Sequence, residues 1–398
     1  MSEWIETTIG DVATVFDGPH ATPKKTETGP WFLSISSLDK GRLNLAESAH
    51  VAEDDFAKWT RRVTPQEGDV LFSYETRLGE AALMPEGIRA CLGRRMGILR
   101  PKRDAVDPKF LLYTYLGPEF QETIAARRIH GATVDRIPLV SLPTWPIRLP
   151  GLAGQQAVVA VLGALDDKIV VNERIAATAR QLALTTFVQA TVDGEPVEVD
   201  VASVSRVLTR GIAPKYSESS DDLVVLNQKC IRDGRVRLAP ARLTLREKVK
   251  APKLLQRNDV LVNSTGVGTL GRVARWTSDD AATVDSHITI VRFEEAAVDP
   301  VCAGFAILRA QPEIEAMGEG STGQTELRRT QLGGLEITLP NMAAQQQLRP
   351  KLDALEERAD QALAESGALT TLRDKLLPQL MSGRLRVKDA EKIVEDNT

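Results

Sequence analysis

Short apolar runs alternate with two much longer helical patterns along this 398-residue chain. Short apolar runs, bounded by Gly, Pro, Asp and Asn, are typical of β-strands. They predict strands at Trp31–Ile35, Val70–Ser73, Met96–Leu99, Leu223–Leu226, Val260–Val262, Gly271–Trp276 and Ile288–Phe293. Helices are predicted at Asp107–Leu116 and Pro118–Arg128, which have a proline at or near the start. Each half of the chain therefore reads as a mixed α/β domain.

A long helix is predicted after each of these domains. In the second half, core positions recur at alternating steps of four and three: Leu348, Leu352, Leu355, Ala359, Ala362, Ser366, Leu369, Arg373, Leu376 and Leu380. This is a coiled-coil period with two polar lapses. Pro378 predicts that the helix ends or kinks near Leu377, because proline has no N–H to donate.

The same register occurs 190 residues earlier, at Val158, Leu162, Leu165, Ile169, Asn172, Ala176, Ala179, Ala183, Thr186 and Ala190. A matched register favours two helices paired antiparallel over the alternative of two ordinary core helices. Asn172 would be a polar residue in the seam, a feature that can fix register at a cost in stability. A helix of about 35 residues is roughly 50 Å long.

An ordered internal repeat supports this duplication. Five pairs of segments match at a shift close to 190 residues: Gly68–Ser73 with Asn258–Asn263, Val106–Phe110 with Val298–Cys302, Gly131–Ile137 with Gly323–Arg329, Ile147–Pro150 with Ile337–Pro340, and Gln155–Gln156 with Gln345–Gln346. The predicted fold is a pseudo-two-fold arrangement of two α/β (mixed α+β) domains joined by two long antiparallel coiled-coil helices. The predicted boundaries are 1–150, 151–193 (helix), 194–340, 341–385 (helix) and a tail at 386–398.

Composition narrows the function classes. The chain is 42% hydrophobic and 26% charged, which is ordinary for a globular protein. Its most apolar run, Val158–Val171, contains three charged residues and is too short to span a membrane. The N-terminus lacks the pattern of a secretory signal. We therefore expect a cytoplasmic protein without a membrane partner.

Candidate chemistry is sparse. Cys91, Cys230 and Cys302 are isolated, and the four histidines are far apart, so neither a metal site nor a disulfide framework is predicted. Gly266, Gly268 and Gly271 form a GxGxxG motif, which leaves a nucleotide-binding enzyme as an alternative. That motif requires a following helix, whereas the sequence predicts a strand. A methyltransferase motif is not apparent, and we expect no catalytic, cofactor or metal residue in this chain.

Several stretches resemble the specificity subunits of type I restriction–modification systems, and the resemblance covers nearly the whole chain. They are Gly29–Leu43, Gly68–Leu83, Asn258–Arg275, Ser321–Leu332 and Leu376–Leu385, together with the two glutamine pairs that open the long helices.

The resemblance implies a non-catalytic DNA-binding subunit. Each α/β domain would be a target-recognition domain for one half of a split, asymmetric site in double-stranded DNA. The helices would set the gap between the half-sites and dock two methyltransferase (modification) subunits, and restriction subunits would complete the nuclease. S-adenosylmethionine, ATP and Mg would belong to those partners.

The net charge of −4 requires basic residues to gather locally if the chain binds DNA. Two basic stretches occur, one from Arg94 to Arg103 and one from Arg127 to Arg136. A solvated surface is the alternative interpretation of each, and a coiled-coil scaffold without DNA is the alternative for the chain.

Polar residues on glycine-rich loops, at matching places in the two halves, are the candidates for contacts with bases or phosphates. In the first half they are His20, Lys24, Lys25, Ser36, Ser37, Tyr74, Thr76, Arg77, Thr133 and Arg136. In the second half they are Lys215, Tyr216, Asn227, Gln228, Lys229, Ser264, Thr265, Arg272, Gln324, Thr325 and Arg328.

Overall fold

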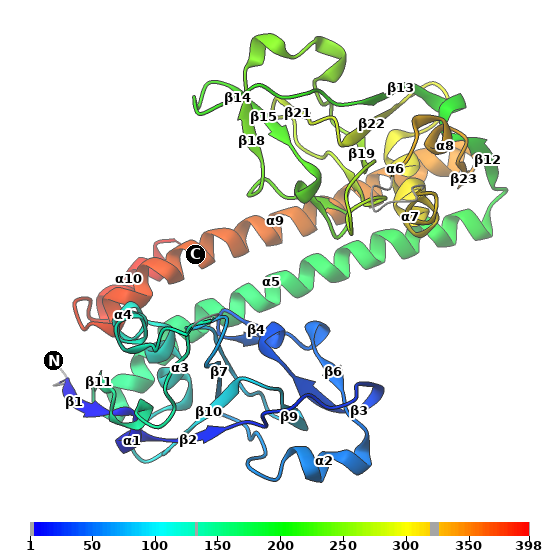
Figure 1. The fold of residues 1–398 in the computed structure, drawn as a ribbon. Coiled ribbons are helices and arrows are strands. Elements are labelled where there is room, and N and C mark those ends of the chain that lie inside the picture. Colours follow the sequence, from blue (N-terminus) through cyan, green and yellow to red (C-terminus); the bar gives the residue numbers. More distant parts are fainter. Residues whose placement is uncertain (1–3, 132–133, 319–325, 398) are drawn as a thin grey trace. The chain divides into compact units, whose positions relative to one another are not determined.

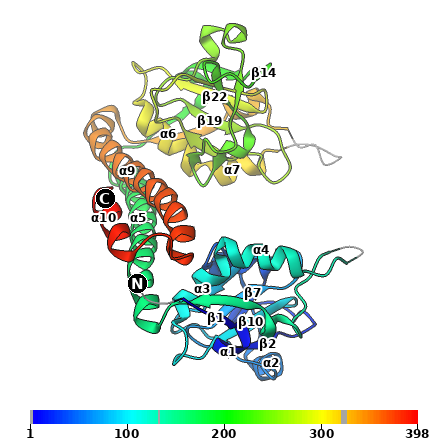
Figure 2. The ribbon, with the colours of Figure 1, turned by 90° about the vertical axis from the view of Figure 1, so that its left-hand side faces the viewer.

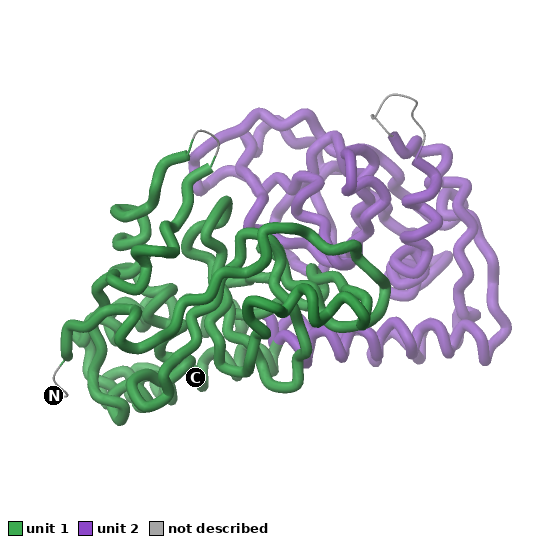
Figure 3. Tube along the Cα trace, turned by 60° about the horizontal axis from the view of Figure 1, so that its bottom comes forward, with its two compact units in different colours: residues 1–172, 364–398 green, residues 173–363 purple. Residues whose placement is uncertain are grey.

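The computed structural model describes residues 4–131, 134–318 and 326–397 (Figure 1). The chain forms two compact units, coloured separately in Figure 3. Unit 1 comprises residues 1–172 and 364–398, and unit 2 comprises residues 173–363. Each unit contains one α/β domain and one half of each long helix. Among the described residues, no helix combines the length and the apolar character that a membrane crossing requires.

The domain of unit 1 is built around an antiparallel four-stranded sheet. Its strands are, in order, β2 (Ala13–Asp17), β10 (Met96–Pro101), β7 (Val70–Ser73) and β8 (Ala81–Leu83). A three-stranded sheet contains β6 (Ala49–His50), β3 (Thr26–Leu33) and β9 (Ala90–Leu92), with β3 parallel to β9. Two-stranded pairs join β1 (Ile5–Thr8) to β11 (Pro146–Leu149) and β4 (Leu38–Asp39) to β5 (Arg42–Leu43).

Both faces of the four-stranded sheet are buried, which explains why its sequence reads as continuous apolar runs. Val70 and Phe72 of β7 face a core that includes the helices α3 (Pro108–Leu116) and α4 (Pro118–Arg127), whereas Leu71 faces the core under the three-stranded sheet. Asp107 caps α3 by accepting from two backbone N–H groups. The remaining helices of this domain are α1 (Ile9–Val12), α2 (Glu53–Trp59), and the 3-10 turns η1 (Ile35–Ser37), η2 (Leu45–Glu47) and η3 (Leu142–Thr144).

The domain of unit 2 repeats this topology, so the predicted duplication is confirmed. Its main sheet has the order β13 (Ser205–Arg210), β22 (Ile288–Phe293), β19 (Val260–Asn263) and β20 (Val273–Arg275). Its second sheet contains β14 (Tyr216–Ser217), β18 (Arg242–Thr244), β15 (Leu223–Leu226) and β21 (Ala282–Val284), with β15 parallel to β21. The pairs are β12 (Val197–Asp200) with β23 (Glu336–Leu339), and β16 (Ile231–Arg232) with β17 (Arg235–Val236). The helices are α6 (Pro300–Arg309), α7 (Gln311–Ala316), α8 (Arg329–Gly333), and η4 (Val201–Val204), η5 (Gln228–Cys230), η6 (Arg246–Lys248) and η7 (Ala251–Lys253).

The two long helices are α5 (Leu152–Asp193) and α9 (Met342–Met381), and they pair antiparallel within each unit. In unit 1 the seam contains Leu162, Leu165 and Ile169 of α5 and Leu369 and Leu376 of α9. In unit 2 one part of the seam consists of four buried alanines, Ala176, Ala179, Ala359 and Ala362. Further along, Ala183 and Phe187 of α5 and Leu348 and Leu352 of α9 are buried in the core of the domain. The predicted register therefore describes the buried seam. It departs from the structure at the end of α5, where the neighbours of Thr186 and Ala190, namely Phe187 and Thr191, are the buried residues.

Polar residues occupy part of the unit 1 seam, as the register predicts. Asn172 is buried, and its side-chain amide donates to the Glu365 carboxylate at 2.7 Å. Arg373 donates to the Asp166 carboxylate at 3.0 Å. The hydroxyl of Tyr113 in α3 also donates to Asp166, at 2.6 Å. This network joins the domain of unit 1 to both of its helices.

The prediction that Pro378 ends or kinks α9 near Leu377 is wrong about the end, because the helix continues to Met381. A proline inside a helix costs about 3 kcal/mol. The turn after it holds because Leu380 and Met381 are buried in the core of unit 1. The residues predicted as a tail contain a further helix, α10 (Val387–Glu395), whose Ala390 is buried in the same core (Figure 2). The predicted strand Trp31–Ile35 ends at Leu33, where the chain turns into η1.

Candidate nucleic-acid interface

Four loops of unit 1 meet at one end of the main sheet, because β10 begins where its neighbours β2 and β7 end. We call the meeting residues, 17–20, 74–76, 94–95, 128–131 and 134–137, loop cluster 1. Backbone hydrogen bonds connect them: Gly18 N–H donates to the Met96 carbonyl, and Tyr74 N–H to the Arg95 carbonyl. The Ile137 N–H in turn donates to the Tyr74 carbonyl. At Gly18 a Cβ atom would lie 2.5 Å from the Met96 carbonyl oxygen, so this close approach requires glycine.

Unit 2 contains an equivalent arrangement, loop cluster 2, formed by residues 210–212, 264–266, 285–287 and 326–328. The Gly211 N–H donates to the Ile288 carbonyl, and the Ser264 N–H to the His287 carbonyl. The Leu327 N–H donates to the Ser264 carbonyl. The two clusters therefore share one backbone plan.

Loop cluster 1 surrounds a hollow of about 570 Å³, lined by Asp17, His20, Tyr74, Glu75, Arg94, Arg95, Ile129, Arg136, Ile137, Pro138, Leu139 and Val140. Members of both basic stretches that are distant in sequence meet here. Four of the predicted residues belong to this cluster, namely His20, Tyr74, Thr76 and Arg136. Lys24 and Lys25 follow in the loop after His20 and are exposed.

Most charges around this hollow are paired. The Asp17 carboxylate contacts His20 at 2.7 Å and Arg62 at 3.2 Å. Glu75 contacts Arg95 at 2.7 Å. On the outer hairpin, Arg128 contacts Asp135 at 3.2 Å. Arg94 and Arg136 are exposed, and neither guanidinium has an ion-pair partner among the described residues.

Three predicted contact residues have buried side chains. Ser37 and Ser264 are fully buried, and the Ser264 hydroxyl bonds to Thr289 at 2.5 Å. Tyr74 is 7% exposed, and burial beside the Asp17 carboxylate raises the pKa of its phenol well above the usual value. These three side chains hold the loops together, so we do not include them in the interface.

Arg77 also has an anchoring position. Its guanidinium donates to the Ile35 and Leu38 carbonyls at 3.2 and 3.3 Å and contacts Glu80 at 3.1 Å. Arg77 therefore connects the turn between β7 and β8 to η1 and to the start of β4. Ser36, which lies in η1, is exposed, and its hydroxyl donates to the Glu47 carbonyl.

Loop cluster 2 contains the predicted residues Thr265 and Arg328, and it pairs its charges differently. Arg210 contacts the Glu326 carboxylate at 2.8 Å, and the Thr265 hydroxyl lies 2.6 Å from the His287 ring. Arg328 and Arg210 line a hollow of about 1050 Å³. Arg272, also predicted, lies at the end of the adjoining turn, where it donates to the Gly268 carbonyl at 2.8 Å.

The other predicted residues of the second half lie near the second sheet of that domain. Asn227 caps η5, its side chain accepting from the Lys229 N–H at 2.9 Å. The Gln228 carbonyl accepts from Asn263 at 2.9 Å. Lys215 and Tyr216 are exposed, and the guanidinium of Arg242 lies 3.5 Å from the Tyr216 ring centroid. Thr133, Gln324 and Thr325 lie outside the described residues.

Sequence reasoning missed Arg210, His287 and Arg329, the last of which also lines the hollow at loop cluster 2. It noted Arg94 and Arg95 only as part of a charged run. A usable signal existed for some of them. Arg210 ends its strand directly before Gly211, and His287 stands directly before the strand Ile288–Phe293. Strand ends that face the same sheet edge are expected to lie together.

The glycine motif does not stand between a strand and a helix, the arrangement of a dinucleotide-binding fingerprint. β19 and β20 are antiparallel partners, so Gly266, Gly268 and Gly271 lie in the turn of a hairpin. All three have positive φ, which glycine adopts without strain. A Cβ at Gly271 would lie 2.6 Å from the Glu315 Cα, so the motif also allows α7 to approach closely.

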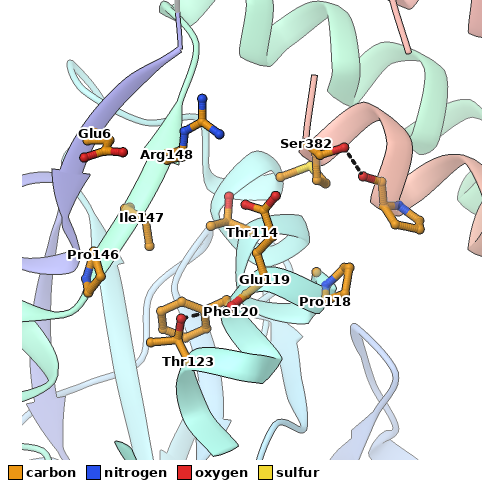
Figure 4. A pocket seen from close by; sticks show the side chains of 13 residues that line it. Glu6, Thr114, Pro118, Glu119, Phe120, Thr123, Pro146, Ile147, Arg148 and Ser382 are labelled. Carbon is orange, nitrogen blue, oxygen red and sulfur yellow. Dashed lines mark hydrogen bonds between the residues drawn. The ribbon is translucent and has the colours of Figure 1, made fainter. Parts of the chain in front are cut away.

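A second hollow in unit 1, of about 380 Å³, lies between α4, the β1–β11 pair and the end of α9 (Figure 4). Phe120 and Ile147 line it, and so do Glu6 and Arg148, which are opposite each other in the register of β1 and β11. Two hydroxyls at this hollow donate to backbone carbonyls four residues earlier in the chain: Thr123 to Glu119, and Ser382 to Pro378. All three cysteines are buried, and burial raises the pKa values of their thiols, to about 11 for Cys91.

Two equivalent α/β domains and two long antiparallel helices give the chain the fold of the specificity subunits of type I restriction–modification systems. It shares this fold with the S subunit from M. genitalium, at a TM-score of 0.61 and 15% identity over 95% of this chain and 96% of that one. The HsdS subunit from Thermoanaerobacter tengcongensis aligns over 96% of this chain and 97% of its own, with 16% identity and a TM-score of 0.38.

In sequence, the chain is similar to a curated protein of Methanocaldococcus jannaschii with the provisional description of type I restriction enzyme MjaX specificity subunit. The two are 21% identical over 97% of this chain and 94% of the relative. No protein-family profile matches the chain.

Proposed function

We propose that this chain is the DNA-sequence specificity subunit of a type I restriction–modification enzyme. The observation that carries the proposal is the presence of two loop clusters with one backbone plan and different side chains. Two related but unlike surfaces in one chain suit a bipartite, asymmetric site in double-stranded DNA, one half-site for each domain. The proposed recognition domains are residues 1–150 and 194–340.

The helices of residues 151–193 and 341–385 set the gap between the half-sites in this proposal. Both α5 and α9 run continuously from one unit into the other, which supports this role. Their outward surfaces dock two methyltransferase subunits, and restriction subunits complete the nuclease. The chain itself is non-catalytic, and the S-adenosylmethionine, ATP and Mg are bound by its partners.

The charge distribution supports DNA binding by local surfaces and not by the whole chain. The net charge is −4, so long-range attraction to the phosphate backbone is weak. Loop cluster 1 nevertheless presents two exposed arginines, Arg94 and Arg136, without an ion-pair partner among the described residues, and Lys24 and Lys25 follow in an adjacent loop. Methyltransferase subunits that clamp the duplex would supply the remaining phosphate contacts.

Methylome sequencing of the host, with and without this chain, tests the proposal. We expect a split motif, two unlike words separated by a gap of fixed length, whose methylation disappears when the gene is deleted and returns on complementation. Methylation that does not change on deletion, or a dependent motif that is continuous, would contradict it.

A further inference from the structure

Equivalent positions of the two loop clusters carry opposite charges. In cluster 1 the backbones of Glu75 and Arg136 form an isolated antiparallel β-bridge, and in cluster 2 the backbones of Thr265 and Glu326 form one in the same way. Because Ile137 and Leu327 make the same backbone bond to the loop opposite, these bridges are equivalent. Arg136 of the first domain therefore corresponds to Glu326 of the second. The sequence match of Gly131–Ile137 with Gly323–Arg329 pairs Arg136 with Arg328 instead, so that match is wrong by two residues at this place.

The loop before β10 differs from its counterpart in the same direction. The Arg95 carbonyl accepts from the Tyr74 N–H, and the His287 carbonyl accepts from the Ser264 N–H at the equivalent place. The residues before them, Arg94 and Ser286, therefore also correspond. The first domain thus places two arginines where the second places a serine and a glutamate.

Of the arginines in loop cluster 1, only Arg94 and Arg136 have guanidinium groups without an ion-pair partner among the described residues. Arg95 is held by Glu75, at 2.7 Å, and Arg128 by Asp135. Both carboxylates of the hollow are engaged as well, because Asp17 has His20 and Arg62, and Glu75 has Arg95. In cluster 2 the corresponding Glu326 is neutralised by Arg210.

An uncommitted guanidinium at the rim of a concave loop surface suits guanine. The planar fork of arginine donates two parallel hydrogen bonds to guanine O6 and N7 in the major groove, which no other base pair accepts in the same way. A salt-bridged glutamate offers neither the charge nor the donors for this contact.

We propose that Arg136, with Arg94 beside it, reads guanine in the half-site of the first domain, and that the equivalent position of the second domain does not. This inference rests on the proposed function, and it adds the residue and the base. The competing role for both arginines is contact with phosphates, which would contribute affinity but no base preference.

The substitution Arg136→Lys separates these roles, because lysine keeps the charge but lacks the rigid, planar guanidinium fork that matches guanine O6 and N7. The matched control is Arg127→Lys, an exposed arginine at the end of α4 that does not line the hollow. Each variant replaces the native chain in the host, and the methylome is sequenced again. We expect Arg136→Lys to relax one guanine position in one half-site, with discrimination reduced about tenfold or more, while the other half-site stays unchanged. Arg94→Lys should act on the same half-site.

A second measurement uses the assembled enzyme and does not depend on methylation in cells. Replacing that guanine by 7-deazaguanine removes the N7 acceptor, so binding by the wild-type enzyme should weaken about tenfold while binding by the Arg136→Lys enzyme should change little. The inference is overturned if neither half-site contains guanine, if Arg136→Lys leaves every position as strict as before, or if deazaguanine has the same effect on both enzymes. If the wild-type chain directs no split motif at all, the proposed function itself fails.

Discussion

Each α/β domain contains, at equivalent positions, a fully buried carboxylate that an arginine neutralises. Asp69 and Asp259 are both 1% exposed, and they accept from Arg100 and Arg292 at 2.8 and 2.6 Å. Each also accepts a backbone N–H from the residue three positions earlier. Burial raises the pKa of the Asp259 carboxyl, whereas the hydrogen bonds from Arg292 lower it. The pair is therefore a place where removal of one partner leaves a charge without compensation.

We expect Arg292→Ala to lower the free energy of unfolding by about 3–5 kcal/mol, because the buried Asp259 loses its counter-charge. Urea unfolding followed by circular dichroism measures this. Arg257→Ala is the matched control, since its partner Asp279 has a side chain that is 81% exposed, and we expect no measurable change there. Equal effects of the two substitutions would show that the buried pair contributes nothing special.

At the scale of the elements, a repeated glutamine joins each domain to its long helix. The Gln155 side chain accepts from the Asp107 N–H at 2.9 Å and donates to the Pro150 carbonyl at 2.9 Å. Gln345 makes the equivalent bonds to Asp299 and Pro340, at 2.8 and 2.7 Å. Each glutamine therefore ties the start of the following helix, α5 or α9, to the cap of α3 or α6. This explains why a glutamine recurs at this place in the repeat.

Gln155→Ala should destabilise the protein by about 2 kcal/mol, because the part-buried Asp107 N–H and the buried Pro150 carbonyl both lose their partner. The adjacent Gln156 is exposed, so Gln156→Ala provides the control. Thermal unfolding of both variants beside the wild type is the measurement. A transition for Gln155→Ala that coincides with the control would show that water replaces the lost bonds.

At the scale of the whole molecule, the proposed function makes the length of the helix pair part of specificity. Seven residues inserted after Asn172 in α5 and seven after Leu363 in α9 would preserve the heptad register and lengthen the pair by about 10 Å. This corresponds to roughly three base pairs of B-DNA. We expect methylome sequencing to show the same two half-sites with a gap longer by about that amount.

The control for this experiment is the insertion in α5 alone, which would shift the seam residues of one helix against the other and should abolish methylation. If the double insertion directs methylation with the original gap, then the helices do not set the spacing.

The sequence by itself determined the elements and their duplication. Val70–Ser73, Leu223–Leu226 and Ile288–Phe293 form strands with the predicted bounds, and the coiled-coil positions form the buried seam over most of its length. These features are accessible because the alternation of apolar and polar residues records which face of a local element is buried. The matching order of segments recorded a duplication that the sheet topologies then confirmed.

Only the tertiary structure decided what individual polar residues do. Arg77 and Arg136 look alike in the sequence, yet Arg77 binds backbone carbonyls of η1 while Arg136 remains exposed. Pro378 is accommodated because buried residues after it hold the last turn of α9. The partners concerned lie far from these residues in sequence, at distances that no local periodicity records. Whether a charge is paired or free therefore depends on which segments the folded chain brings together.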